Sequence, residues 1–217
     1  MDTAAGVLDS DRCGALPPGQ TCSCLNPVLP VPRLDKLKSI WFQIFQRNLQ
    51  LIADTVSITA AGTSAANLDV VLVGASITEH WLGTNLGARE PKWDEHLQVY
   101  QELFQNNDNH NNNAVTGLAL GIGGDNCPRL LYRLMNGVMA ELHSNASSAA
   151  LQPDVWWILI GTNECSAFCK AEQIVTGTVR IVQEIRKRRP SATVVVNYIL
   201  PRGRNWRLGP DLSCLHI

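Results

Sequence analysis

Asp69-Val-Val-Leu-Val-Gly-Ala-Ser-Ile-Thr78 contains four consecutive apolar residues, numbers 70–73, which end at Gly74. An unbroken apolar run of this length predicts a short strand buried on both faces, as in parallel sheets. Ser76 follows the glycine closely, so we expect its hydroxyl at the carboxyl end of the strand, where open α/β sheets bind ligands. A serine on such a strand-to-helix turn has the geometry of a nucleophile. The alternative is that Ser76 only caps the helix that begins near Thr78.

Two later segments repeat this pattern of an apolar run, a glycine and a polar residue. They are Gly117-Leu-Ala-Leu-Gly-Ile-Gly-Gly-Asp125 and Asp154-Val-Trp-Trp-Ile-Leu-Ile-Gly-Thr-Asn-Glu164. Because the carboxyl ends of parallel strands meet at one edge of a sheet, we expect all three polar ends to lie together there. The glycines allow backbone N–H groups to face a bound group, and Asn163 supplies a side-chain amide donor. A serine, a backbone N–H and an Asn amide are the parts of an oxyanion hole.

The rest of the chain alternates between helical and strand patterns. Amphipathic spacing predicts helices over residues 34–55, 92–105, 128–142 and 171–189, and an apolar run predicts a further strand over residues 192–200. This alternation predicts a three-layer α/β/α fold with a parallel sheet between helices. Composition divides the chain into a flexible, proline-rich leader (1–34), an amphipathic helix with a small-residue linker (35–67) and a domain that contains the strand motifs (68–217).

The order of these motifs resembles the SGNH (GDSL-type) hydrolase superfamily, and within it the platelet-activating factor acetylhydrolase catalytic subunits. Further matches are Gly121-Ile-Gly-Gly-Asp-Asn-Cys-Pro-Arg-Leu-Leu-Tyr-Arg-Leu134, Asn136-Gly137 and Leu200-Pro-Arg-Gly203. The resemblance implies a flavodoxin-like sheet and a serine esterase for small acyl esters, acetyl esters among them, that uses no cofactor. It implies that Ser76 is the nucleophile and that the N–H groups of Ser76 and Gly124, with the Asn163 amide, hold the oxyanion. A homodimer is expected by analogy alone.

The chain departs from this family at three places. Ala75 stands where the family has the Asp of Gly-Asp-Ser, and Ala119 stands where an Asn commonly precedes the glycine block. No Asp-x-x-His motif follows the last predicted strand. The resemblance implies that this motif supplies the general base, so we expect the chain to lack the family's last strand and helix. Asp211 with His216, at a different spacing, and His80 are the candidates for a substitute base.

Two interpretations from other functional classes stay open. A non-catalytic binding or scaffold protein that kept the fold is consistent with Ala75 and with the absent Asp-x-x-His motif. Nucleotide binding by Gly121-Ile-Gly-Gly124 is weaker, because the dinucleotide fingerprint needs a third glycine and Asn126 occupies its position. Ester turnover distinguishes an enzyme from a scaffold.

Composition excludes several classes of protein. A net charge of −1 gives no field that would attract nucleic acid. No apolar run approaches the ~20 residues of a membrane helix. Residues 1–19 lack the apolar core of a signal peptide, so we predict a cytoplasmic protein. The resemblance implies that its partner is a small-molecule ester substrate.

Seven cysteines are an odd number, and a cytoplasmic protein is expected to keep its thiols reduced. Cys13, Cys22 and Cys24 lie in the leader without an evident fourth metal ligand, so no metal site is predicted. Cys165 and Cys169 follow Asn163 and are expected to pack as small apolar side chains.

Overall fold

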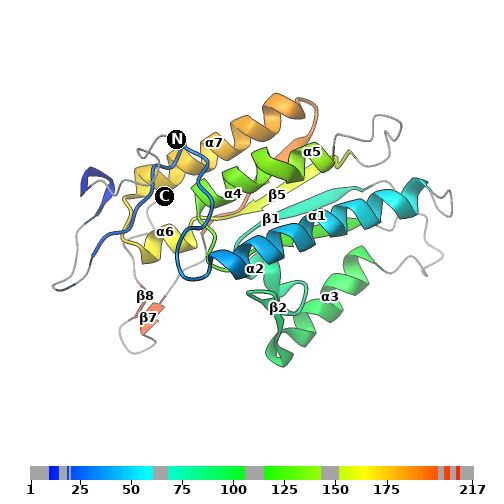
Figure 1. Cartoon of the computed structure of the whole chain (residues 1–217), viewed down its shortest axis with the longest axis horizontal. Coiled ribbons are helices and arrows are strands. Elements are labelled where there is room, and N and C mark those ends of the chain that lie inside the picture. The colour runs from blue at the N-terminus through cyan, green and yellow to red at the C-terminus, as the bar shows by residue number, and fades with distance from the viewer. Residues whose placement is uncertain are drawn as a thin grey trace.

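A four-stranded parallel sheet forms the centre of the computed structural model of this chain (Figure 1). The strands lie in the order β4-β1-β5-β6. They are β1 (Val70–Gly74), β4 (Gly117–Gly121), β5 (Val155–Leu159) and β6 (Thr193–Val196). The structure describes residues 10–14, 19, 21–60, 68–105, 115–142, 152–199, 203–205 and 209–210. The predicted α/β fold with a parallel sheet is therefore confirmed.

Helices α1 (Lys38–Ala60), α4 (Cys127–Arg133) and α7 (Ala171–Arg188) pack on one face of the sheet, which we call the covered face. Helix α4 continues through a π-helical turn, η4 (Leu134–Val138), into α5 (Met139–Glu141). The strand side chains that point to this face are buried and form the main core with the helices; they include Val71, Val73, Trp156 and Ile158. Alternation along each strand places the neighbouring side chains on the opposite face.

The opposite face is only partly covered by the described residues. Helix α3 (Asp94–Phe104), which follows the short turn η3 (Pro91–Trp93), packs Tyr100 against Leu72 and Ala119. The hydroxyl of Tyr100 donates to the carbonyl of Gly117 at 2.9 Å and accepts from the N–H of Ala119 at 3.2 Å. We call this opposite face the open face, because no described helix lies over its β5–β6 half. Trp157 in that half is 41% exposed.

Several element boundaries differ from the predicted ones. Helix α1 begins at Lys38 rather than at residue 34, because Asp35 forms a turn: its side chain accepts from Leu37 N and its carbonyl from Lys38 N, both at 2.9 Å. Strand β6 spans four residues, whereas nine were expected. The predicted helix over residues 128–142 is interrupted, since Asn136 leaves helical geometry inside η4. Pro128 occupies the first turn of α4, as predicted.

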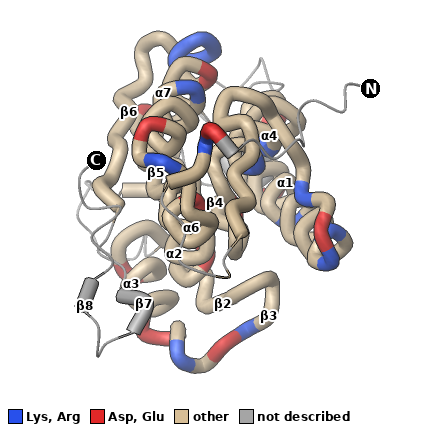
Figure 2. Tube along the Cα trace, turned by 90° about the vertical axis from the view of Figure 1, so that its left-hand side faces the viewer, with Lys and Arg blue, Asp and Glu red and all other residues tan. Residues whose placement is uncertain are grey.

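The remaining elements are short: η2 (Ser10–Arg12), α2 (Ser76–His80), the pair β2 (Thr84–Asn85) and β3 (Ala88–Arg89), α6 (Thr162–Ser166), and the pair β7 (Gly203–Asn205) and β8 (Gly209–Pro210). Basic side chains gather at the end of α7 (Figure 2), where they oppose the negative end of the helix dipole. Within the described residues, no helix has the length and apolar character needed to cross a membrane.

The described part of the leader is packed against the rest of the chain. Cys24, Val31 and Arg33 are buried, and Val31 N donates to the carbonyl of Pro128 at 3.1 Å. This differs from the loosely attached segment that its proline content suggests, because the leader has apolar and charged side chains with partners elsewhere in the fold. The division into domains at residues 34 and 67 stays a prediction.

Candidate active site

The three strands that precede the predicted site residues end at the same level. Gly74 of β1 lies beside Gly121 of β4 and beside Leu159 of β5. Ser76 therefore follows its strand end by two residues, and Gly124 and Asn163 follow theirs by three and four. The fold thus brings all three to the carboxyl edge of the sheet, as expected.

Ser76 is the first residue of α2, directly after the strand, and its side chain is half-buried. Ala75 occupies the N-cap position and makes no side-chain hydrogen bond, so the alternative that Ser76 caps a helix starting near Thr78 is wrong. Gly74 makes this sharp turn possible, because a Cβ there would collide with the Leu159 carbonyl and the Thr78 hydroxyl. Within the described part of the chain, the Ser76 hydroxyl has no hydrogen-bond partner.

Glu79 connects the helix of Ser76 to the glycine loop, a role that the sequence patterns did not reveal. Its buried carboxylate accepts from Gly123 N at 2.6 Å and from Gly87 N at 2.7 Å. A side chain at Gly121 would collide with the backbone at Glu79 and Ala75, so the loop approaches α2 as closely as glycine allows. These contacts fix the distance between Ser76 and the glycine loop.

Asn163 lies in α6, which begins after Gly161 at a φ of +112°. Its Nδ2 donates to the carbonyl of Asp125 at 2.7 Å, so the amide is held against the glycine loop. A primary amide has two N–H groups, and this bond uses one of them. The second is the donor that an oxyanion at Ser76 would require.

A buried ion pair supports the glycine loop from the covered face. The carboxylate of Asp125 accepts from Arg133 Nε at 2.8 Å and from Trp41 Nε1 at 2.6 Å. Arg133 also donates to the carbonyls of Leu120 and Gly74, both at 2.9 Å. Burial raises the pKa of Asp125, and the charge of Arg133 opposes this. One guanidinium therefore joins the ends of β1 and β4 to the loop.

Two arginines lie against Gly124. Arg33, from the leader, donates to the Gly123 carbonyl at 3.0 Å and pairs with Asp35 at 2.9 Å. Arg129 donates to the Gly124 carbonyl at 2.9 Å. Gly124 has a φ of +77°, and a Cβ there would lie 2.8 Å from Arg33 Nη1, so both its conformation and its surroundings favour glycine. The positive charges lie beside the predicted oxyanion donor, where they favour negative charge.

Glu164 and Cys127 form a buried pair next to Asn163. The Glu164 carboxylate accepts from Cys127 N at 2.5 Å, and its Oε2 has no partner among the described residues. Burial raises the pKa of Glu164. Burial and the Glu164 charge raise the pKa of the Cys127 thiol well above its ordinary value. Cys127 is therefore held as an unreactive thiol rather than as a second nucleophile.

Of the three candidates for a substitute base, the structure describes only His80. His80 stacks on Trp93 with ring centroids 3.7 Å apart, and burial lowers its pKa. This position commits the imidazole to an aromatic stack with Trp93, which in turn contacts the ring of His96. Asp211 and His216 lie outside the described residues.

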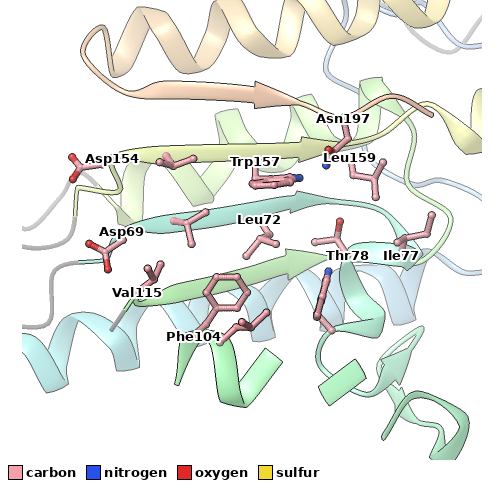
Figure 3. Close-up of a pocket in the computed structure, with 14 residues that line it drawn as sticks. Asp69, Leu72, Ile77, Thr78, Phe104, Val115, Asp154, Trp157, Leu159 and Asn197 are labelled. Carbon is pink, nitrogen blue, oxygen red and sulfur yellow. The ribbon is translucent and has the colours of Figure 1, made fainter. Parts of the chain in front are cut away.

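A long apolar groove lies on the open face and has a volume of about 720 Å³ (Figure 3). Ile77 and Thr78, directly after Ser76, line one end, and Asp69 and Asp154 line the other. The side chains between the two ends are mostly apolar and include Leu72, Phe104 and Trp157. The groove therefore begins beside the candidate site and follows the strands away from it.

The cysteines differ from the expectation of packed, reduced thiols. Cys13 is paired with Cys22, Cys24 is paired with Cys169, and Cys165 is also disulfide-bonded. The prediction that Cys165 and Cys169 act as small apolar side chains is therefore wrong. The pairing of Cys169 depends on the fold, because its partner is 145 residues away.

Comparison with known proteins places the chain among acylhydrolases. Residues 72–213 match the sequence model of the GDSL-like Lipase/Acylhydrolase family, which is more than half of the 217 residues. Platelet-activating factor acetylhydrolase IB subunit alpha1 of Rattus norvegicus is 33% identical over 108 residues, covering 50% of this chain and 38% of that protein. Subunit alpha2 of Homo sapiens is 31% identical over 109 residues, covering 50% and 39%.

The matched part of the chain thus spans less than half the length of these relatives. Among solved structures, a GDSL-like lipase from Bacteroides thetaiotaomicron has a TM-score of 0.43 and 17% sequence identity. That alignment covers 75% of this chain and 65% of the lipase chain.

Proposed function

This chain belongs to the GDSL-like lipase/acylhydrolase family, and we propose that it hydrolyses esters of small acyl groups with Ser76 as the nucleophile. The observation that supports this proposal best is the common edge at which Ser76, Gly124 and Asn163 follow three neighbouring strands. Acetyl esters are the first substrates to test, because the curated relatives are named acetylhydrolases.

In this proposal the Ser76 oxygen attacks the ester carbonyl carbon, and the alcohol leaves from the tetrahedral intermediate. The N–H groups of Ser76 and Gly124 and the free N–H of the Asn163 amide stabilise the negative oxygen. Arg33 and Arg129 donate to the carbonyls of Gly123 and Gly124 in the same loop. A general base must take the Ser76 proton, give it to the leaving alcohol and later activate water.

The test compares Ser76→Ala with Ser191→Ala, an exposed serine in the turn before β6. A fluorophosphonate probe, located by mass spectrometry, should label Ser76 in the unsubstituted chain and in Ser191→Ala. Hydrolysis of p-nitrophenyl acetate should fall by up to about 10⁶-fold in Ser76→Ala if a base is present. Asn163→Ala should lose about 10²–10³-fold in kcat, the effect of removing one oxyanion donor.

The same measurements separate the enzyme from a scaffold protein without a base. A folded chain that is neither labelled at Ser76 nor active on the ester contradicts the proposal and favours the binding alternative. If the chain is active, His80→Ala and His216→Ala identify the base, because only the variant that removes it should approach the rate of Ser76→Ala.

A further inference from the structure

Four cysteines from distant parts of the chain meet beside the end of α6. The Sγ atoms of Cys13, Cys22 and Cys24 all lie within 4.8 Å of one another. The Sγ of Cys24 is bonded to that of Cys169, which is 145 residues further along the chain. The leader alone offers three sulfur ligands. The fold adds a fourth, Cys169, which no sequence motif near the leader indicates.

Backbone hydrogen bonds hold these segments together independently of any bond between sulfur atoms. Cys13 and Cys169 face each other in an isolated antiparallel bridge. On either side of it, Gly14 N donates to the Phe168 carbonyl at 2.7 Å, and Lys170 N donates to the Arg12 carbonyl at 3.0 Å. The second part of the cluster, Cys22-Ser-Cys24, is placed by Ser23 N, which lies 3.4 Å from the carbonyl of Ala167. The four sulfurs would therefore stay close together after reduction.

We propose that the reduced cluster is a structural zinc site in which Cys13, Cys22, Cys24 and Cys169 bind one Zn²⁺ as thiolates. A tetrahedral zinc ion holds thiolate sulfurs at about 2.3 Å, which sets them about 3.8 Å apart. The sulfurs of the leader already lie within 4.8 Å of one another. The Cys169 sulfur is close to that of Cys24, and its side chain must rotate toward Cys13 and Cys22 to complete the tetrahedron. Four protein ligands leave no open position, which is the arrangement of structural rather than catalytic zinc.

The two disulfides are the oxidised form of the same site. A chain made in a reducing compartment has free thiols there and binds zinc directly, with release of four protons to solvent. Starting from the oxidised form, a dithiol reductant must first supply two electrons and two protons to each disulfide. Zinc then displaces the four thiol protons, and no atom of the active site takes part.

The surroundings suit a site of net charge −2. Arg12 directly precedes Cys13 and Lys170 directly follows Cys169, so two cationic residues adjoin the ligands in the chain. The ion would also fix the end of α6, because Cys169 N donates to the Glu164 carbonyl at 3.0 Å and Glu164 follows Asn163. The cluster would thereby attach the leader to the helix that contains the predicted oxyanion donor.

The test measures metal directly and does not depend on ester hydrolysis. The full chain is purified under dithiol reductant from cells supplied with zinc, and its metals are measured by plasma mass spectrometry. One zinc per chain is expected in the unsubstituted protein and in Cys127→Ser, whose cysteine is free and buried outside the cluster. After brief dialysis against a weak chelator, Cys169→Ser and Cys22→Ser should each retain at least tenfold less zinc per chain than the unsubstituted protein.

A spectroscopic measurement decides the matter if a cysteine variant does not fold. Cobalt added to the reduced, metal-free chain should give the absorption bands of a tetrahedral tetrathiolate site, and zinc should abolish them. X-ray absorption of the zinc form should give four sulfur neighbours at about 2.3 Å. A metal-free reduced chain that binds neither ion overturns the proposal. So does stoichiometric zinc in Cys169→Ser, or iron in place of zinc.

Discussion

Trp156 and Trp157 are neighbours on strand β5 and share one side-chain type, yet they have opposite environments. Trp156 points to the covered face and is 0% exposed, whereas Trp157 points to the open face and is 41% exposed. The difference comes from the alternation of side chains along a strand and from the unequal cover on the two faces. A run of apolar residues therefore predicts a strand, but it does not by itself show which face has a partner.

The two faces also relate differently to the candidate site. On the covered face, the glycine loop is held by Arg133 and Asp125, which are both fully buried. On the open face, the groove begins at Ile77 and Thr78 and continues along apolar side chains, of which Trp157 is exposed and Leu72 is buried (Figure 3). We therefore expect substitutions on the covered face to affect both stability and the site, and substitutions at exposed groove positions such as Trp157 to affect stability little.

The largest effect should come from Arg133→Met. The substitution leaves the Asp125 carboxylate buried without its ion-pair partner and removes donors from the carbonyls of Gly74 and Leu120. Loss of one member of a buried ion pair costs about 3–5 kcal/mol, and we expect the upper end of that range. Urea unfolding followed by circular dichroism measures the loss. Arg186→Met, at an exposed position of α7, is the control and should change stability by about 0.5 kcal/mol or less.

The second prediction compares the two tryptophans directly. Trp156→Ala opens a cavity in the main core and should cost about 3 kcal/mol or more in the free energy of unfolding. Trp157→Ala removes a side chain that already faces the groove and should cost about 1 kcal/mol. Each variant is the matched control of the other, because the two sites share a strand and a residue type.

Equal losses in the two variants would break the comparison. They would mean that another segment or another chain covers Trp157 in solution, since an exposed indole has little packing to lose. Quenching of tryptophan fluorescence by iodide gives an independent check. Trp157→Ala should lower the part of the signal that iodide quenches, and Trp156→Ala should leave that part in place.

The fold was largely predictable because its signals are local. Strands β1 and β4 end at the glycines that end their apolar runs, and β5 ends at Leu159, two residues before Gly161. The extent of β6 was not predictable from its apolar run. Its length is set by pairing with β5, which covers only residues 193–196. Hydrophobic periodicity likewise does not predict which segments of the chain pack on the open face.

The candidate site was predictable only where its residues follow strands. Ser76, Gly124 and Asn163 each stand a few residues after a strand end, so their position follows from the sheet. Arg33 contacts the loop across 90 positions of sequence and Glu79 across 44, and no local spacing indicates either contact.

The smallest expected effect concerns the buried carboxylate of Glu164 in α6, which accepts from the first N–H of α4, that of Cys127. Burial raises the pKa of Glu164, so the folded chain holds this proton more tightly than the unfolded chain, whose glutamates titrate near about 4.3. Stability from this group is therefore complete below the unfolded pKa and is lost as the pH rises through the folded pKa. Glu164→Gln cannot ionise, so its stability should decline less across that interval than that of the unsubstituted chain. Glu102→Gln, at an exposed position of α3, should leave the pH profile unchanged, and a profile that shifts equally in both variants would contradict the assignment to Glu164.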